Sequence, residues 1–180
     1  SRKIGFRTFA IVTGPDENPS YVNASVGKEG TENNGMFFRV NGAAVFARGA
    51  NMIPMEELEG RADANALHGL VKSAADAGFN ILRNWGGGVF QYNAWYDACD
   101  EFGIMIYHDM MFAQRGHSPQ VSKTEELEFR HQARRLAQHP SIVIWDGCNE
   151  CKVDMSGPTA IYATFLLTVI AEEDRMRSIW

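Results

Sequence analysis

Hydrophobic residues are spaced differently at the start of the chain and in the rest of it. One apolar run, residues 3–12, is followed up to residue 35 by a polar stretch that is rich in glycine and has no periodicity. This pattern predicts one strand and a long surface loop. Two short apolar runs, residues 36–40 and 43–48, then flank Asn41-Gly42, a pair that tolerates the positive φ angles of a type I′ turn. They predict a β-hairpin.

From about residue 45, short apolar runs alternate with amphipathic segments. The runs are typical of buried strands, and we expect strands at residues 45–51, 79–85, 104–107, 141–145 and 178–180. The first two amphipathic segments have apolar residues on one helical face and end at a glycine that can cap a helix. These residues are Leu67, Leu70, Val71, Ala74 and Ala75 before Gly78, and Trp95, Tyr96, Cys99 and Phe102 before Gly103.

Two further helices are expected. Ser122 and Glu125 have the spacing of a capping box, in which each side chain satisfies a backbone donor of the first turn, and His139-Pro140 ends that helix. The other helix covers residues 159–173. Short apolar strands that alternate with amphipathic helices predict a parallel sheet covered by helices, so the expected fold class is α/β. A doubly wound sheet and a (β/α)8 barrel both fit this pattern.

Three classes of function are disfavoured by the sequence. Gly86-Gly87-Gly88 follows an expected strand but lacks the Gly-x-Gly-x-x-Gly spacing of a dinucleotide site. The 17 basic and 22 acidic side chains give a formal net charge of -5, and no Lys/Arg run is longer than a pair, which argues against nucleic acid as a partner. The most apolar stretch, residues 160–171, contains polar residues and is shorter than the ~20 residues that span a bilayer. We therefore expect no membrane segment.

Polar side chains follow the expected strands of the sheet. The first strand ends at Asn51, the second at Arg83-Asn84-Trp85, the third at His108-Asp109 and the fourth at residues 146–150. In a (β/α)8 barrel, the residues just after the carboxyl ends of the strands do the chemistry. Each residue alone could cap a loop, form an ion pair or belong to the core. Four such strand ends in succession favour a functional site.

Glu150 is the most informative of these residues. A carboxylic acid at a barrel mouth, beside Asn149 and near an aromatic residue such as Trp145 or Trp85, is placed to keep a proton through burial and to deliver it to a leaving oxygen. This is the chemistry of a glycosidase, which normally has two carboxylates flanking the scissile bond. A surface glutamate that starts a loop is the alternative interpretation.

Five motifs occur in order along the chain. They are Gly-Ala-Asn-Met-Ile-Pro at 49–54, Leu-Arg-Asn-Trp-Gly-Gly-Gly at 82–88, Tyr-Asp-Ala-Cys-Asp-Glu-Phe-Gly-Ile at 96–104, His-Asp-Met-Met-Phe-Ala at 108–113 and His-Pro-Ser-Ile-Val-Ile-Trp-Asp-Gly-Cys-Asn-Glu at 139–150. Together they resemble the β-mannosidases of glycoside hydrolase family 2, from about residue 37 to residue 180. The Trp-Gly-Gly-Gly form favours the mannosidase branch over the galactosidase and glucuronidase branches.

The resemblance implies a domain organisation. Residues 1–35 are expected to be the end of an immunoglobulin-like β-sandwich domain and a linker loop, with residues 3–8 as its closing strand. Residues 36–180 are expected to be the first half of a (β/α)8 barrel, since a complete barrel needs about 250 residues. The family's nucleophile, a glutamate on the seventh strand, would lie beyond Trp180. The chain is therefore expected to be a segment of a longer enzyme, inactive alone and dependent on the remainder of the polypeptide.

The resemblance also implies roles for individual residues. The family's general acid/base falls on Glu150, Asn149 is expected to hydrogen-bond the sugar 2-hydroxyl, Trp85 and Asp109 line the subsite of the terminal mannose, and Arg83 supports the site. The family's usual Gly-Asn-Asn-Glu is Gly-Cys-Asn-Glu here, which removes one polar contact. The expected substrate is a β-mannoside oligosaccharide or glycoprotein glycan, without a cofactor or metal ion. Lysosomal or secreted residence is implied, and the sequon at Asn23 agrees with it.

Other interpretations stay open. Cys148 and Cys151 form a Cys-x-x-Cys pair, which could be a redox dithiol or part of a zinc site, although Cys99 and the histidines are not at paired spacing. A non-catalytic carbohydrate-binding or scaffold protein could keep the barrel without turnover. An endo-β-mannosidase or an exo-β-glucosaminidase of the same family would look nearly identical over this stretch.

Overall fold

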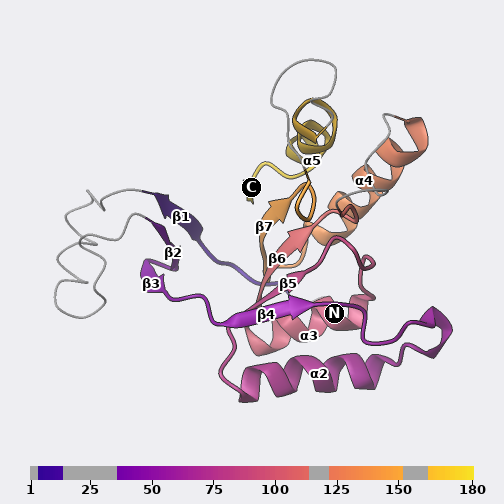
Figure 1. Cartoon of the computed structure of the whole chain (residues 1–180). Helices are drawn as coiled ribbons and strands as arrows, with labels where there is room; N and C mark the ends of the chain where they lie inside the picture. Colours follow the sequence, from indigo (N-terminus) through magenta and orange to yellow (C-terminus); the bar gives the residue numbers. More distant parts are fainter. Residues whose placement is uncertain (1–3, 14–35, 114–121, 152–161) are drawn as a thin grey trace.

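The computed structural model describes residues 4–13, 36–113, 122–151 and 162–180 (Figure 1). The strands among these residues form two sheets, one of three antiparallel strands and one of five parallel strands. The loop expected before residue 35 lies outside the described residues, as does the sequon at Asn23.

The antiparallel sheet has the order β1-β2-β3, with β1 at Phe9–Thr13, β2 at Met36–Val40 and β3 at Ala43–Val45. The expected hairpin is confirmed, because Asn41 (φ 50) and Gly42 (φ 84) both adopt the left-handed conformation between β2 and β3. The first strand begins at Phe9, later than expected. Since β1 pairs with β2, the sheet joins residues on both sides of the boundary proposed at residue 35.

The parallel sheet has the order β4-β5-β6-β7-β8. All five expected strands are confirmed, with boundaries shifted by a few residues, at β4 Gly49–Met52, β5 Ile81–Asn84, β6 Met105–Asp109, β7 Ile142–Asp146 and β8 Ser178–Ile179. The strands β6 and β7 pair out of regular register between Ile106 and Tyr107. Every strand is parallel to its neighbour, so all carboxyl ends lie at one edge of the sheet.

The helices are α2 Ala64–Asp76, α3 Asn93–Phe102, α4 Lys123–Leu136 and α5 Leu167–Glu173, together with a short 3-10 turn, Glu59–Arg61. The capping box is confirmed, because the Glu125 N–H donates to Ser122 Oγ over 3.2 Å and Ser122 is the N-cap of α4. Gly103 (φ 70) caps α3 as expected. The fourth expected helix differs in that a π-helical turn, Tyr162–Leu166, precedes α5, and residues 159–161 are outside the described residues.

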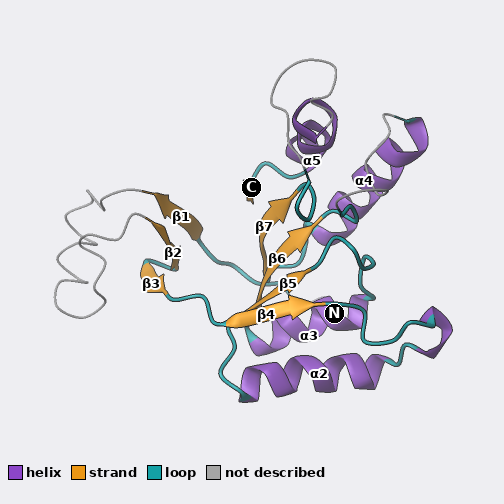
Figure 2. Cartoon of the chain, viewed as in Figure 1, coloured by secondary structure: helices purple, strands orange, loops and turns teal. Residues whose placement is uncertain are grey.

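The helices pack against one face of the parallel sheet. Figure 2 shows α2 and α3 side by side beneath β4 and β5, with α4 and α5 further around the sheet. The side chains of Trp95, Tyr96 and Cys99 are fully buried there, as their helical spacing predicted. Leu70 is an exception, since it was expected on the buried face of α2 but is 39% exposed, whereas Leu67 and Val71 are buried. The helix buries a narrower stripe than the pattern indicated, since Leu67 and Val71 are its buried residues.

The opposite face of the sheet has two zones. Near the amino ends of the strands, Met105, Val143 and Ile144 form an apolar cluster with residues of the antiparallel sheet, including Phe9 and Phe38. Toward the carboxyl ends, this face is polar. Parallel strands with all their helices on one face form the first half of a (β/α)8 barrel, as expected, preceded by a β-hairpin and strand. None of the described helices is both long and apolar enough to cross a membrane.

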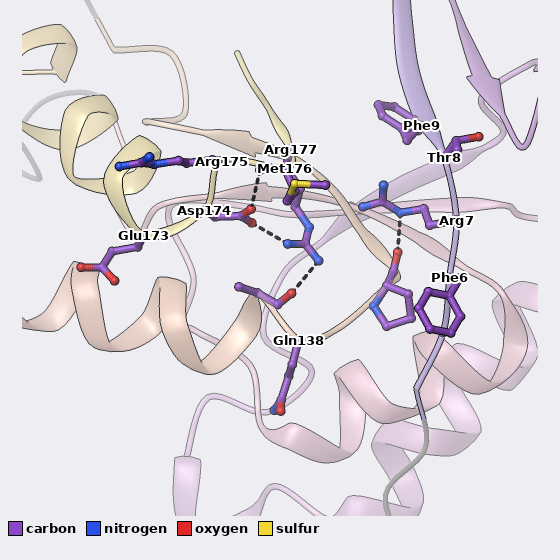
Figure 3. Close-up of a pocket in the computed structure, with 13 residues that line it drawn as sticks. Phe6, Arg7, Thr8, Phe9, Gln138, Glu173, Asp174, Arg175, Met176 and Arg177 are labelled. Carbon is purple, nitrogen blue, oxygen red and sulfur yellow. Dashed lines mark hydrogen bonds and ion pairs between the residues drawn. The ribbon is translucent and has the colours of Figure 1, made fainter.

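A cavity of about 590 Å³ lies at the amino ends of β7 and β8 (Figure 3). Arg177 crosses it and donates to the carbonyls of Ala137 (2.8 Å) and His139 (2.7 Å), while its guanidinium pairs with the buried Asp174. Arg7 Nε donates to the Pro140 carbonyl over 2.7 Å. The Arg7 bond attaches the segment before β1 to the residues that precede β7. In this fold the amino-end face contributes stability and not chemistry.

Candidate active site

Three of the residues expected in the site meet at the carboxyl ends of β5, β6 and β7. Arg83 Nε donates to Asp109 Oδ1 over 2.9 Å, and Arg83 Nη2 donates to Asp109 Oδ2 over 2.7 Å. The same Nη2 donates to Asn149 Oδ1 over 3.0 Å. A bidentate arginine–carboxylate pair of this kind fixes both groups in position as well as in charge. Arg83 therefore connects three neighbouring strands.

Asp109 is fully buried behind this pair. A third bond, from the Gly86 N–H to Asp109 Oδ2 over 2.9 Å, comes from the loop after β5. Burial raises the pKa of Asp109 to about 6, although the bonds from Arg83 and Gly86 favour the charged form. Gly86 must be a glycine here, because a Cβ would overlap the carbonyl oxygens of Met110 and Phe112.

Tyr107 and Asp146 complete the polar face, and Tyr107 was not among the residues that the sequence suggested. The Tyr107 hydroxyl donates to Asp146 Oδ2, and the Arg83 guanidinium lies 5.5 Å from the centre of the Tyr107 ring. Burial, together with the Asp146 carboxylate, raises the pKa of Tyr107. The signal that could have found Tyr107 is the alternation of a strand, since Tyr107 and Asp109 are two residues apart and share a face.

His108 lies on the opposite, helix-covered face, so it is not part of this polar group. Its Nδ1 donates to the Asp109 carbonyl (2.7 Å), and its Nε2 accepts from the Tyr96 hydroxyl (2.8 Å). Burial lowers the pKa of His108 to about 3, so the ring is neutral. Asn84 also faces this side, and its Nδ2 donates to the Val89 carbonyl over 3.2 Å. These residues hold the strand ends and the glycine-rich loop in place.

The segment after β7 is attached to the segment after β6. The Asn149 N–H donates to the Phe112 carbonyl over 3.0 Å, and Asn149 forms a parallel bridge with Ala113. Asp146 Oδ1 accepts from the Cys148 N–H over 3.2 Å. Asn149 is buried, and its side chain reaches Arg83 as described above.

Glu150 follows Asn149 directly and differs from it in two respects. Its φ angle is 53°, in the left-handed region that few residues other than glycine adopt. It is also exposed, so the burial that we expected for this carboxylate is not found in the segment. The two aromatic residues expected near Glu150 lie in different places. Trp145 is fully buried on the helix side of the sheet, where its Nε1 donates to Asp174, whereas Trp85 is half-buried.

Trp85 is held in the loop after β5. Its backbone N–H donates to the Met52 carbonyl over 3.2 Å, and its ring lies so close to Gly87 that a Cβ there would overlap the ring. Asn51 pairs in register with Arg83 and is exposed on β4. Cys148 and Cys151 are joined in a disulfide that brackets Asn149-Glu150, while Cys99 is free and buried.

Comparisons with known proteins first indicate the class of this fold. No family model matches the chain. Among solved structures, a β-glucuronidase from Parabacteroides merdae superposes with a TM-score of 0.68 at 19% identity, covering 98% of this chain and 21% of that one, and shares the fold. The two chains therefore share a fold in which helices cover a sheet of parallel strands.

Within that class, the chain is similar to β-mannosidases. The β-mannosidase of Capra hircus is 36% identical over 152 residues, and β-mannosidase B of Emericella nidulans is 34% identical over 152 residues. Each alignment covers 83% of this chain and 16% of the relative. The β-D-mannosidase from Dictyoglomus thermophilum superposes with a TM-score of 0.73 at 30% identity, covering 98% of this chain and 22% of that one. The chain therefore spans about a sixth of the length of these curated relatives, and the resemblance that the motifs indicated is confirmed.

Proposed function

We propose that the chain is a segment of a retaining exo-β-glycosidase that removes terminal β-D-mannose from oligosaccharides or glycoprotein glycans. In this proposal the segment carries the general acid/base, Glu150, but not the nucleophile. The observation that carries it is the bidentate Arg83–Asp109 pair, which also holds Asn149, the residue directly before Glu150. The similarity to β-mannosidases supplies the substrate class.

The geometry supports a division of roles. Glu150 would protonate the leaving oxygen and then take a proton from the attacking water. Because Arg83 donates to Asn149 Oδ1, the Nδ2 group of Asn149 is the part that can donate to the sugar 2-hydroxyl. Asp109 is fully buried, so its part is to hold Arg83, and through it Asn149, in place. The half-buried Trp85 ring offers an apolar surface for the sugar.

A retaining mechanism needs a second carboxylate ~5 Å from the acid/base. Glu172 and Glu173 do not serve, because both pair with Arg130 on the helix side, and Glu173 pairs with Arg134 as well. The hydrogen bonds from Arg134 and Arg130 lower the pKa of Glu173 to about 2. We therefore place the nucleophile in the remainder of the parent polypeptide and expect the segment alone to be inactive. We also expect the parent to be lysosomal or secreted.

The experiment is the hydrolysis of aryl β-mannoside, β-glucoside, β-galactoside and β-glucosaminide by the full-length protein. The variants are Glu150→Gln and, as a matched control, Glu128→Gln, which makes the same charge change on the exposed face of α4. The mannoside should be cleaved fastest, Glu150→Gln should lose about 10²-fold or more, and Glu128→Gln should be unaffected. Preference for the glucosaminide would instead identify an exo-β-glucosaminidase. Binding without cleavage by the unaltered protein would contradict an enzymatic function.

A further inference from the structure

The loop of residues 148–151 is closed by the disulfide between its first and last residues. The two Cα atoms are 5.6 Å apart. The ring that results contains only Asn149 and Glu150 between the two cysteines. The proposed acid/base and its neighbour therefore lie inside the ring that this disulfide closes.

The residues before Glu150 are held by hydrogen bonds. The Cys148 N–H donates to Asp146 Oδ1 at the end of β7, and Cys148 is buried. The Asn149 N–H donates to the Phe112 carbonyl, and its side chain is held by Arg83. The residue after Glu150, Cys151, is held by the disulfide. The backbone on both sides of Glu150 is thus fixed, by hydrogen bonds on one side and by a covalent bond on the other.

The backbone conformation of Glu150 requires such restraint. A φ of 53° in a residue with a side chain costs on the order of 1 kcal/mol or more, and it persists only where the surroundings impose it. The direction in which the Glu150 carboxylate leaves the backbone depends on this conformation. Releasing the loop on one side would let the residue relax toward an ordinary φ and would move the carboxylate.

We propose that Cys148 and Cys151 are positioning residues, whose disulfide holds Glu150 in the orientation that acid/base catalysis needs and whose reduction switches that catalysis down. The inference rests on the proposed function of Glu150. Reduction by a dithiol or a phosphine adds two electrons and two protons to the disulfide, yields two thiols and oxidises the reductant. Oxidation by a disulfide oxidant reverses the step and restores the orientation.

The first test is chemical and uses the full-length protein. Free thiols are alkylated in denaturant without reduction, the protein is digested, and the mass of the peptide that contains Cys148 and Cys151 is measured by mass spectrometry. The peptide should be unmodified and lighter by two hydrogen atoms than its reduced form, while Cys99 should be alkylated. Alkylation of Cys148 and Cys151 in the unreduced protein would overturn the inference.

The second test separates positioning from general structure by varying the leaving group. A phenyl β-mannoside has a poor leaving group and needs the proton from Glu150, whereas a dinitrophenyl β-mannoside needs it far less. Reduction of the native protein, or the Cys148→Ser/Cys151→Ser double variant, should lower kcat/KM for the phenyl substrate about tenfold or more and change that for the dinitrophenyl substrate little. Retained activity on the dinitrophenyl substrate shows that the protein is folded.

Two controls make the outcome decisive. Reductant should have no further effect on the double variant, and Cys99→Ala should respond to reductant like the unaltered protein. Equal losses on both substrates, or no loss on either, would refute a positioning role. If the unaltered protein cleaves neither mannoside, the proposed function has failed, whereas normal cleavage that is insensitive to reduction contradicts only the inference about the disulfide.

Discussion

Replacing Arg83 by methionine tests the centre of the proposed site. The substitution keeps an unbranched side chain of similar length but removes all three hydrogen bonds to Asp109 and Asn149. Asp109 then stays fully buried with one remaining donor, the Gly86 N–H. Removing one partner of a buried ion pair costs about 3–5 kcal/mol. Because Arg83 is 28% exposed, we expect the lower end of this range.

The loss of folding free energy caused by Arg83→Met should depend on pH. Asp109 already has its pKa raised to about 6, and without Arg83 it rises further. A carboxyl whose pKa is raised in the folded state binds a proton more readily there than in the unfolded chain, so folding becomes more favourable as the pH falls through that pKa. The cost of Arg83→Met should therefore be largest at pH 8 and smaller at pH 5.

The measurement is denaturant unfolding of the full-length protein, followed by tryptophan fluorescence at both pH values, for Arg83→Met, Asp109→Asn and the double variant. Asp109→Asn should cost less than Arg83→Met, because Arg83 can reach solvent and the amide can still accept from Gly86. The double variant should be more stable than the sum of the two single losses implies. Additive losses, or a pH-independent cost for Arg83→Met, would refute this account of the pair.

Three further outcomes follow from the described contacts. Arg177→Met should lower the free energy of unfolding by about 3 kcal/mol, because it removes the ion-pair partner of the buried Asp174. The exposed Arg175→Met should change it little in the same denaturant titration. Burial lowers the pKa of His108 to about 3, so between about pH 6.5 and pH 4 the unfolded chain binds a proton that the folded protein does not, and stability falls as the pH falls. His108→Gln should therefore make the free energy of unfolding depend less on pH in this range. An unchanged pH profile would show that His108 does not contribute. Ser122→Ala should lower stability by about 1 kcal/mol through loss of the cap on α4, and Ser122→Asp should restore it in thermal unfolding if the hydrogen bond is the cause.

Signals carried by neighbouring residues were predicted well from the sequence. The turn at Asn41-Gly42, the cap at Ser122 and the glycine that ends α3 each depend on the backbone within a few residues, and the structure confirms all three. The strand-end residues Arg83, Asp109 and Asn149 were also named from the sequence, and the structure brings them into contact. Their roles in catalysis stay predictions.

Features that depend on distant parts of the chain were missed or misjudged. Leu70 fits the helical period but is exposed, since burial depends on what packs over α2. Trp145 and Trp85 are both adjacent to polar strand-end residues in the sequence, yet only the fold shows that Trp145 faces the helices. Tyr107 was overlooked because its partners, Asp146 and Arg83, come from other strands.

The sequence alone determined the order of elements, the α/β class and, through its motifs, the family that the chain resembles. Each of these follows from local backbone preferences, from the periodicity of apolar residues or from a run of residues read in order. The tertiary structure alone decided which side chains of adjacent strands share a face, since strand register and the irregular pairing near Ile106 set that choice. It also decided that Asp109 is buried between Arg83 and Gly86 and that Glu150 lies within a closed disulfide ring. Both depend on contacts between segments that are distant in sequence or on a bond that spacing alone cannot assign.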